Sequence, residues 1–144
     1  MALSVERNVN GPVWPVGLAT VAASGTPVNV MKAVDSTLGN APESSAPTIT
    51  GEYPVRCQQI IFQALKSVAP VVQNVGPAYV LIPPAAGGTG NKTDSGALVK
   101  VLAPGETFIL GAAALSHNVF NPYQYLIDAD NAGDGVLVTL LIMG

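Results

Sequence analysis

The chain of 144 residues has the length of one domain with a substantial core. Only six of its residues are basic and nine are acidic, while 49% are hydrophobic. Surface charge keeps soluble proteins apart, and an ordinary domain is about a quarter charged. So few charges predict that much of the surface is covered by other protein, in an oligomer or a lattice.

The composition also argues against several functional classes. The net charge of −3 and the scatter of the basic residues argue against a protein that neutralises phosphates, so nucleic acid is not an expected partner. No apolar run is long enough to cross a membrane, and the first seven residues lack the pattern of a secretory signal. We therefore expect synthesis in the cytoplasm of a cell. Cys57 has no cysteine to pair with and is interpreted as a small buried hydrophobe.

Residues 1–15 are predicted to form an extended N-terminal arm. They show no period and end in a segment with two prolines, Pro12 and Pro15, which remove backbone donors and cannot lie inside a sheet. Trp14 either anchors the arm in a pocket of a neighbouring subunit or packs back onto its own domain. Val13, Trp14 and Pro15 are therefore candidate interface residues.

Residues 16–144 are predicted to form the folded domain, and its first part contains two short strands. The apolar runs 18–23 and 28–32 flank four residues with turn chemistry, Ser24 to Pro27, which predicts a hairpin. Residues 36–54 are small, polar and rich in proline without any period. They predict a long loop, of the kind that is usually functional or mobile.

Residues 55–66 fit two periods. Apolar residues occur at helical spacing, but Ile60, Phe62 and Ala64 also line one face of a strand. The neighbouring segments 71–74 and 77–82 are short, β-branched or aromatic, and separated by Asn, Gly and Pro, which is typical of strands. We therefore predict a strand.

A second loop and a second hairpin-like unit follow. Residues 83–95 are rich in glycine but lack the Gly-Lys-Ser/Thr of a phosphate-binding loop, so a surface loop is predicted. The runs 97–102 and 107–110 flank Ala103-Pro104-Gly105-Glu106, in which Pro and Gly favour a type II turn.

The C-terminal part predicts two more strands, residues 123–127 and 136–142, joined by the loop 128–135. The last strand is apolar on both faces, because Val136, Val138 and Leu140 alternate with Leu137 and Leu141. A strand of this kind is buried on both sides. One side can meet the core, whereas Leu137 and Leu141 need a second sheet, a long loop or another subunit, which makes them candidate interface residues.

Taken in order, several short motifs resemble a known family of virion proteins. They are turn and strand signatures spread over about residues 17–143: Ser24-Gly25-Thr26-Pro27-Val28, Arg56-Cys57-Gln58-Gln59-Ile60, Gly76-Pro77-Ala78-Tyr79-Val80, Leu102-Ala103-Pro104-Gly105-Glu106, and Tyr125-Leu126-Ile127-Asp128-Ala129-Asp130 with Ala132-Gly133-Asp134. The chain is thus similar to the jelly-roll capsid decoration (cement) proteins and head-fibre bases of tailed bacteriophages.

The resemblance implies an all-β fold, a single jelly-roll-like antiparallel β-sandwich behind the extended arm. It also implies a homotrimer that sits on the capsid surface of the virion, binds the major capsid protein and bridges its subunits. The arm and the loop 36–54 depart from the smallest members of the family and leave the docking mode open.

The chain has few of the residues that form catalytic or metal sites. It has one histidine, His117, which stands next to Ser116, and neighbouring residues of a loop do not make a nucleophile and base. One histidine is also too few for a cupin-type metal site. We expect neither an enzyme nor a cofactor.

Residues 128–134 contain the best metal candidate. Asp128, Asp130 and Asp134 provide oxygen ligands at a spacing that can hold calcium, but the bidentate Glu of an EF-hand loop is missing. A turn in which Asp and Asn cap their own backbone explains the same residues, and we favour this interpretation.

Three functions follow from these patterns. The favoured one is a capsid decoration protein that stabilises a shell by adhesion. The alternatives are another virion component, such as a tail, baseplate, fibre-attachment or minor capsid module, and a carbohydrate-binding jelly roll. The last would stack sugars on aromatic side chains, for which the candidates are Trp14, Tyr53, Tyr79, Tyr123 and Tyr125.

Overall fold

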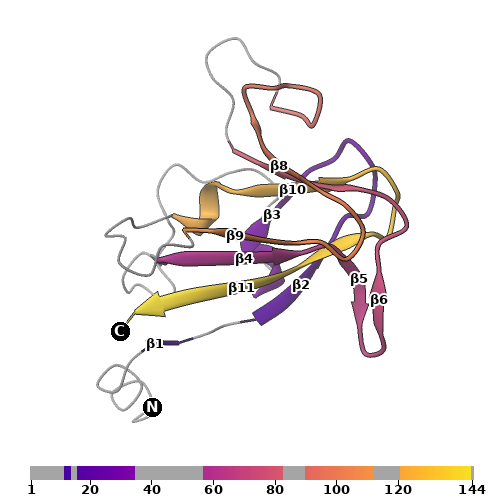
Figure 1. The fold of residues 1–144 in the computed structure, drawn as a ribbon. Helices are drawn as coiled ribbons and strands as arrows, with labels where there is room; N and C mark the ends of the chain where they lie inside the picture. Colours follow the sequence, from indigo (N-terminus) through magenta and orange to yellow (C-terminus); the bar gives the residue numbers. More distant parts are fainter. Residues whose placement is uncertain (1–11, 14–15, 35–56, 83–89, 112–120, 144) are drawn as a thin grey trace.

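The computed structural model describes residues 12–13, 16–34, 57–82, 90–111 and 121–143, and every structural statement below concerns these residues (Figure 1). The chain is all-β, and the described residues contain no α-helix. None of their helices is long and apolar enough to span a membrane. The strands are β1 (Pro12–Val13), β2 (Val16–Thr20), β3 (Val28–Asn29), β4 (Gln59–Gln63), β5 (Leu65–Val68), β6 (Val71–Gln73), β7 (Ala78–Leu81), β8 (Leu98–Leu102), β9 (Thr107–Leu110), β10 (Leu126–Ala129) and β11 (Gly135–Met143). Two short 3₁₀ helices are η1 (Val30–Ala33) and η3 (Pro122–Gln124).

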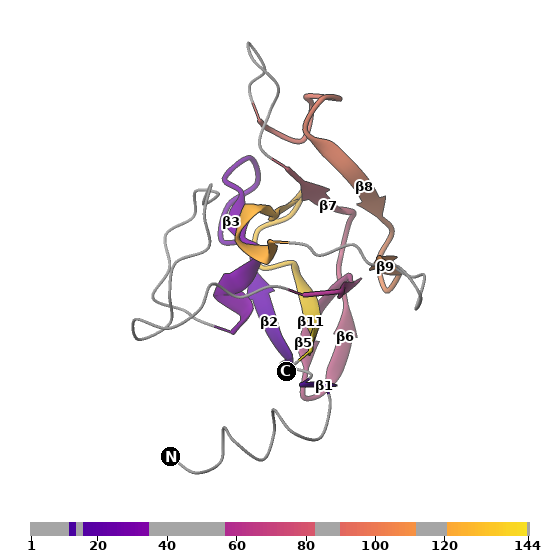
Figure 2. The same cartoon turned by 90° about the vertical axis from the view of Figure 1, so that its left-hand side faces the viewer.

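The strands form two larger antiparallel sheets and one hairpin. The five-stranded sheet has the order β1-β11-β4-β9, and β2 also pairs with β11. The four-stranded sheet has the order β3-β10-β7-β8, and β5 and β6 pair only with each other. Figure 2 shows β2 and β11 of the five-stranded sheet side by side.

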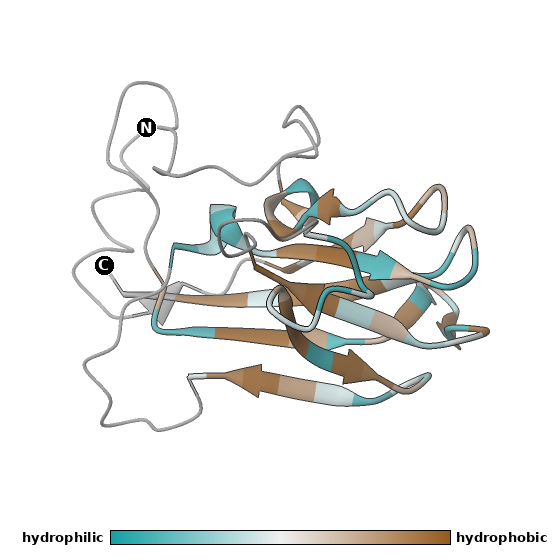
Figure 3. Cartoon of the chain, turned by 90° about the horizontal axis from the view of Figure 1, so that it is seen from above, coloured by the Kyte–Doolittle hydropathy of each residue, from teal (hydrophilic) through white to brown (hydrophobic). Residues whose placement is uncertain are grey.

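The core lies between the two larger sheets and is built by side chains that alternate along the strands. In β11 the side chains of Val136, Val138 and Leu140 are buried, as are those of Ile60 and Phe62 in β4. They pack with residues of the other sheet such as Val80, Ile127 and Ala129 in one apolar cluster. Figure 3 shows these apolar stretches along the strands and the more polar residues in the connections.

The prediction of a hairpin over residues 18–32 is wrong. The strand β2 pairs with β11, whereas β3 pairs with β10 in the other sheet. The second run continues as the 3₁₀ helix η1 because the Asn29 side chain caps it, accepting a hydrogen bond from the Met31 amide at 2.9 Å. This helix packs on β2 at Gly17, where an added Cβ would lie 1.7 Å from the Ala33 carbonyl oxygen.

The turn predicted at residues 103–106 is confirmed, but the strands around it do not form a hairpin. Gly105 has φ +79°, and the Glu106 amide donates to the Ala103 carbonyl oxygen at 2.9 Å. The strand before the turn, β8, pairs with β7, and the strand after it, β9, pairs with β4. The turn is therefore a corner between the two sheets.

The other predicted strands agree with the structure in part, and the predicted loops lie largely outside the described residues. The strand interpretation of residues 55–66 is confirmed by β4 and β5, although 55 and 56 lie outside the described residues. The strand expected at 123 begins only at Leu126, because Pro122 and the capping side chain of Asn121 start the 3₁₀ helix η3. The loop 36–54 and residues 83–89 of the loop 83–95 also lie outside the described residues.

The N-terminal arm is described only at Pro12 and Val13. These two residues are extended, as predicted, and pair with Met143 and Ile142 of β11. The position is compatible with proline because β1 is an edge strand. Trp14 and Pro15 lie outside the described residues.

Candidate interaction surfaces

The outer face of the five-stranded sheet is the first candidate surface. Register places alternate residues of β2, β4, β9 and β11 on this face, opposite to the core. We call it the outer sheet face and define it by its six apolar residues: Val16, Leu18, Ile61, Ile109, Leu137 and Leu141. Its other side chains are threonines and glutamines, and these four strands carry no charged residue.

Exposure on this face rises from the middle of the sheet to its edges. Val16 of β2 is 56% exposed and Ile109 of β9 is 43% exposed, while Leu137 and Leu141 of the central strand are half-buried. The strand β11 is therefore buried on its core face and only half-buried at Leu137 and Leu141, and the contact of these two leucines with another subunit stays a prediction. A sheet face that combines exposed apolar side chains with no charge is typical of a surface covered by another protein.

The hairpin of β5 and β6 is the second candidate surface. In Figure 1 it projects from the end of the sheet at which β4 ends and β11 begins. All three residues of β6 are exposed, and Val71 is 70% exposed. Val68, Val72 and Val75 are exposed as well. No interface is predicted at these valines from the sequence, although the β-branched run between turn residues is the signal that could have indicated one.

The base of this hairpin is tied to the start of β11 by polar side chains. The Asp134 carboxylate accepts hydrogen bonds from the amides of Val75 and Gly76, both at 3.0 Å. The buried Asn74 side chain forms two further hydrogen bonds with the backbone of Gly135. These bonds fix the direction in which the hairpin projects.

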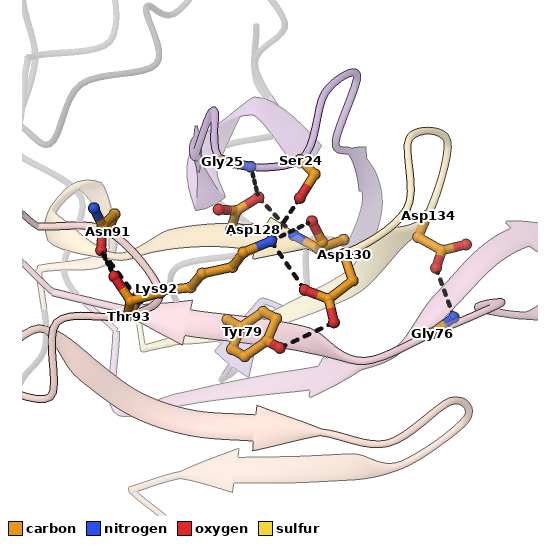
Figure 4. Close-up of polar contacts among 11 residues, drawn as sticks. Ser24, Gly25, Gly76, Tyr79, Asn91, Lys92, Thr93, Asp128, Asp130 and Asp134 are labelled. Carbon is orange, nitrogen blue, oxygen red and sulfur yellow. Dashed lines mark hydrogen bonds and ion pairs between the residues drawn. The ribbon is translucent and has the colours of Figure 1, made fainter.

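A lysine-centred cluster covers the outside of the four-stranded sheet (Figure 4). The Lys92 ammonium lies 2.9 Å from an Asp130 carboxylate oxygen, and it also donates to Ser24 Oγ at 2.6 Å and to the Ala129 carbonyl oxygen at 3.2 Å. Tyr79 donates its hydroxyl to Asp130, and its ring lies 5.4 Å below the ammonium. These contacts connect the loop around Lys92 to β10 and to the turn at Ser24.

Charge in this cluster shifts the pKa of Asp130. The hydrogen bond from Lys92 holds this pKa below its usual range; partial burial acts in the opposite direction, and the Tyr79 hydroxyl adds to the lowering. Burial acts to lower the pKa of Lys92, but the hydrogen bond to Asp130 and the attraction of Asp128 and Asp130 outweigh it, so the pKa is raised.

The structure places the three calcium candidates in different environments. Asp128 is fully buried and accepts from the amides of Gly25 and Ala129, Asp130 binds Lys92, and Asp134 binds the hairpin base. Within the described ranges, no three acidic, histidine or cysteine side chains form a group that could hold a metal ion. The arrangement favours the interpretation as a hydrogen-bonded turn.

An open groove of about 340 Å³ lies beside β2 and the turn that follows it. Small side chains such as Ala22, Ala23 and Thr26 line it, with Lys32 as its charged residue. The groove thus lacks the convergent polar groups that orient a small ligand.

Three of the aromatic candidates for sugar stacking, Tyr79, Tyr123 and Tyr125, belong to the described residues, and Tyr125 is partly buried against the core cluster. Tyr123 is fully buried and offers no ring face to a ligand, and the ring of Tyr79 lies below Lys92. Trp14, Tyr53 and His117 lie outside the described residues. Comparison of the chain with family models, with curated proteins and with solved structures finds no match.

Proposed function

We propose that this chain is a structural virion protein that decorates the outer surface of a phage capsid as a homo-oligomer and bridges major capsid subunits. The observation that carries the proposal is the outer sheet face, an uncharged surface on which Val16 and Ile109 are exposed. In a chain with only fifteen charged residues, such a face is suited to permanent contact with protein.

The order of the strands supports a jelly roll. Without β1 and the β5–β6 hairpin, eight strands remain, and they form two sheets with the orders β2-β11-β4-β9 and β3-β10-β7-β8. Two such four-stranded sheets, with chain crossings between them, are the architecture of the jelly roll, which occurs in viral capsid and lectin domains. One fold serves many functions, so the proposed function rests on the surfaces of this domain and not on its strand order.

Adhesion to a shell needs no catalytic group and no cofactor. Burial of apolar area stabilises a contact by roughly 25 cal/mol per Å², so a patch of a few hundred Å² contributes several kcal/mol before the cost of association. A capsid repeats this contact many times, because each copy bridges neighbouring subunits. The sum over many copies would strengthen the whole shell.

Co-sedimentation with shells tests the proposal. Undecorated shells, assembled from the major capsid protein encoded in the same genome, are mixed with the purified chain and pelleted. We expect saturable binding and a higher melting temperature of the decorated shells. A chain that stays in the supernatant at every ratio would move the assignment to another virion component, such as a tail or fibre module.

A further inference from the structure

Residues 90–97, which we call the strap, are organised around their own polar side chains. The two oxygens of the Asp94 carboxylate accept backbone hydrogen bonds, one from Gly90 at 3.1 Å and the other from Gly96 at 3.0 Å. The Asp94 amide donates in turn to the Asn91 carbonyl oxygen at 2.9 Å. These local bonds define the shape of the strap independently of its contacts with the rest of the domain.

Polar contacts of Lys92 attach the strap to the domain. None of residues 90–96 has a large apolar side chain, and Ala97, at the end of the strap, is the one residue of the strap that is buried. Apolar packing therefore fixes only the end next to β8. Lys92 extends from the middle of the strap to the turn at Ser24 and to the end of β10 (Figure 4).

A buried carboxylate lies next to the Lys92 ammonium. Asp128 is fully buried, and its Oδ1 accepts hydrogen bonds from the amides of Gly25 and Ala129. Lys92 itself binds Ala129 and the residue before Gly25, so the two charged groups share their neighbours. The Oδ2 atom of Asp128 has no hydrogen-bond partner among the described residues. A carboxylate oxygen in this position is better solvated in contact with bulk water.

The closed and open arrangements of the strap differ by opposing polar contributions. Closure gains the ion pair of Lys92 with Asp130, whose side chain is 42% exposed, so that this contribution is small. Opening gives Asp128 access to water and leaves the apolar core unchanged. Segments with few buried apolar contacts open at a free energy well below that of global unfolding. The strap meets this condition.

We propose that the strap opens as one unit while the rest of the domain stays folded, with Lys92 as its latch and Ala97 as its fixed end. Opening gives water access to the Asp128 carboxylate. The charge of Lys92 holds the strap closed, because this ammonium interacts with both Asp128 and Asp130. The inference concerns a motion within one chain and does not depend on capsid binding.

Amide hydrogen exchange followed by NMR measures this opening. The amides of Gly25 and Ala129 both donate to Asp128, so their exchange reports the access of water to this carboxylate. The amides of Val75 and Gly76 are the matched reference. They donate in the same way to a second fully buried aspartate, which lies at the base of the β5–β6 hairpin and outside the lysine-centred cluster.

The wild type is compared with Lys92→Met, which removes the charge of the latch, and with the control Lys100→Met, which removes an ion pair with Glu106 instead. In Lys92→Met we expect exchange at Gly25 and Ala129 to be about tenfold or more faster, with the two reference amides unchanged. The control should leave all four amides unchanged. Equal acceleration of all four in Lys92→Met would overturn the proposal, because it would indicate a loss of global stability. Unchanged exchange of all four would overturn it as well.

The same spectra test whether the strap moves as one unit. The amides of Gly90 and Gly96 donate to Asp94 within the strap, so they should keep their chemical shifts and exchange rates in Lys92→Met. Asp94→Ala removes the acceptor of both amides and supplies the spectrum of a strap without these local bonds. If Lys92→Met moved both amides to the positions seen in Asp94→Ala, the strap would unfold instead of opening as a unit, and the proposal would be wrong.

Discussion

Asn74 and Gly135 form two reciprocal hydrogen bonds across 61 residues of sequence. The Asn74 side-chain amide donates to the Gly135 carbonyl oxygen at 2.8 Å, and the Gly135 amide donates back to the Asn74 side-chain oxygen at 3.0 Å. The side chain thus makes the two backbone hydrogen bonds that a neighbouring strand would otherwise make with Gly135, the first residue of β11. Since Asn74 directly follows β6, it joins the hairpin to the sheet.

Replacing Asn74 should therefore destabilise the whole domain. Asn74→Ala leaves a buried N–H and a buried C=O of Gly135 without partners, which should lower the free energy of unfolding by roughly 2–4 kcal/mol. Gln63→Ala is the control, because the single hydrogen bond from Gln63 to Gly105 is 3.4 Å long and only partly buried. Urea unfolding measures both, and equal losses would contradict the structural role of Asn74.

The free energy of unfolding should depend on the charge of Asp134 but hardly on the charge of Asp130. Asp134→Asn turns one acceptor oxygen into an NH₂ group that faces a backbone N–H of Val75 or Gly76. We therefore expect the free energy of unfolding to fall by roughly 1.5–3 kcal/mol. Asp130→Asn breaks an ion pair whose carboxylate side is 42% exposed, and about 0–1 kcal/mol is expected. A comparison of both variants by denaturant unfolding checks the order, and the reverse order would contradict it.

The turns could be predicted from the sequence, but the pairing of the strands could not. Pro104 and Gly105 determine a local backbone conformation, so the corner at 103–106 was found at the right place. Whether the strands on both sides pair depends on residues far away, and here they join β7 and β4. The same reason explains why β2 and β3 were wrongly joined as a hairpin.

The candidate surfaces were partly predictable for a similar reason. Leu137 and Leu141 could be predicted because the sequence of a single strand is enough to show that both of its faces are apolar. Val16 and Ile109 belong to the same face only through their register with neighbouring strands. The partner of Asp130 is 38 residues away in the chain, so no local pattern pointed to Lys92.

The ion pair between Lys92 and Asp130 should be visible in the titration of one carboxyl group. Lys92→Met keeps much of the length of the side chain but removes the ammonium, so the pKa of Asp130 should rise towards its ordinary value of about 3.9. Carbon-detected NMR of the Asp130 carboxyl signal over about pH 2 to 6 measures this pKa in both proteins. Lys100→Met, which removes an ion pair with Glu106 instead, is the control.

The sign of the pH dependence follows from the same shift. Because the folded pKa of Asp130 lies below the unfolded one, the ion pair stabilises the fold above about pH 4 and loses this effect as the pH falls through the folded pKa. Its exposure limits the contribution to about 1 kcal/mol or less. An unchanged Asp130 titration in Lys92→Met would contradict the role of Lys92.

Cys57 should be chemically inert as long as the domain is folded. Burial raises the pKa of its thiol to about 12, and the side chain is 1% exposed. At pH 8 the thiolate fraction should then be on the order of a thousandfold lower than for a free thiol of pKa about 8.5, before restricted access is counted. An aromatic disulfide reagent should label the native protein very slowly and the urea-unfolded protein at once. Stoichiometric labelling of the native protein within the mixing time, with Cys57→Ala unlabelled, would contradict the buried position.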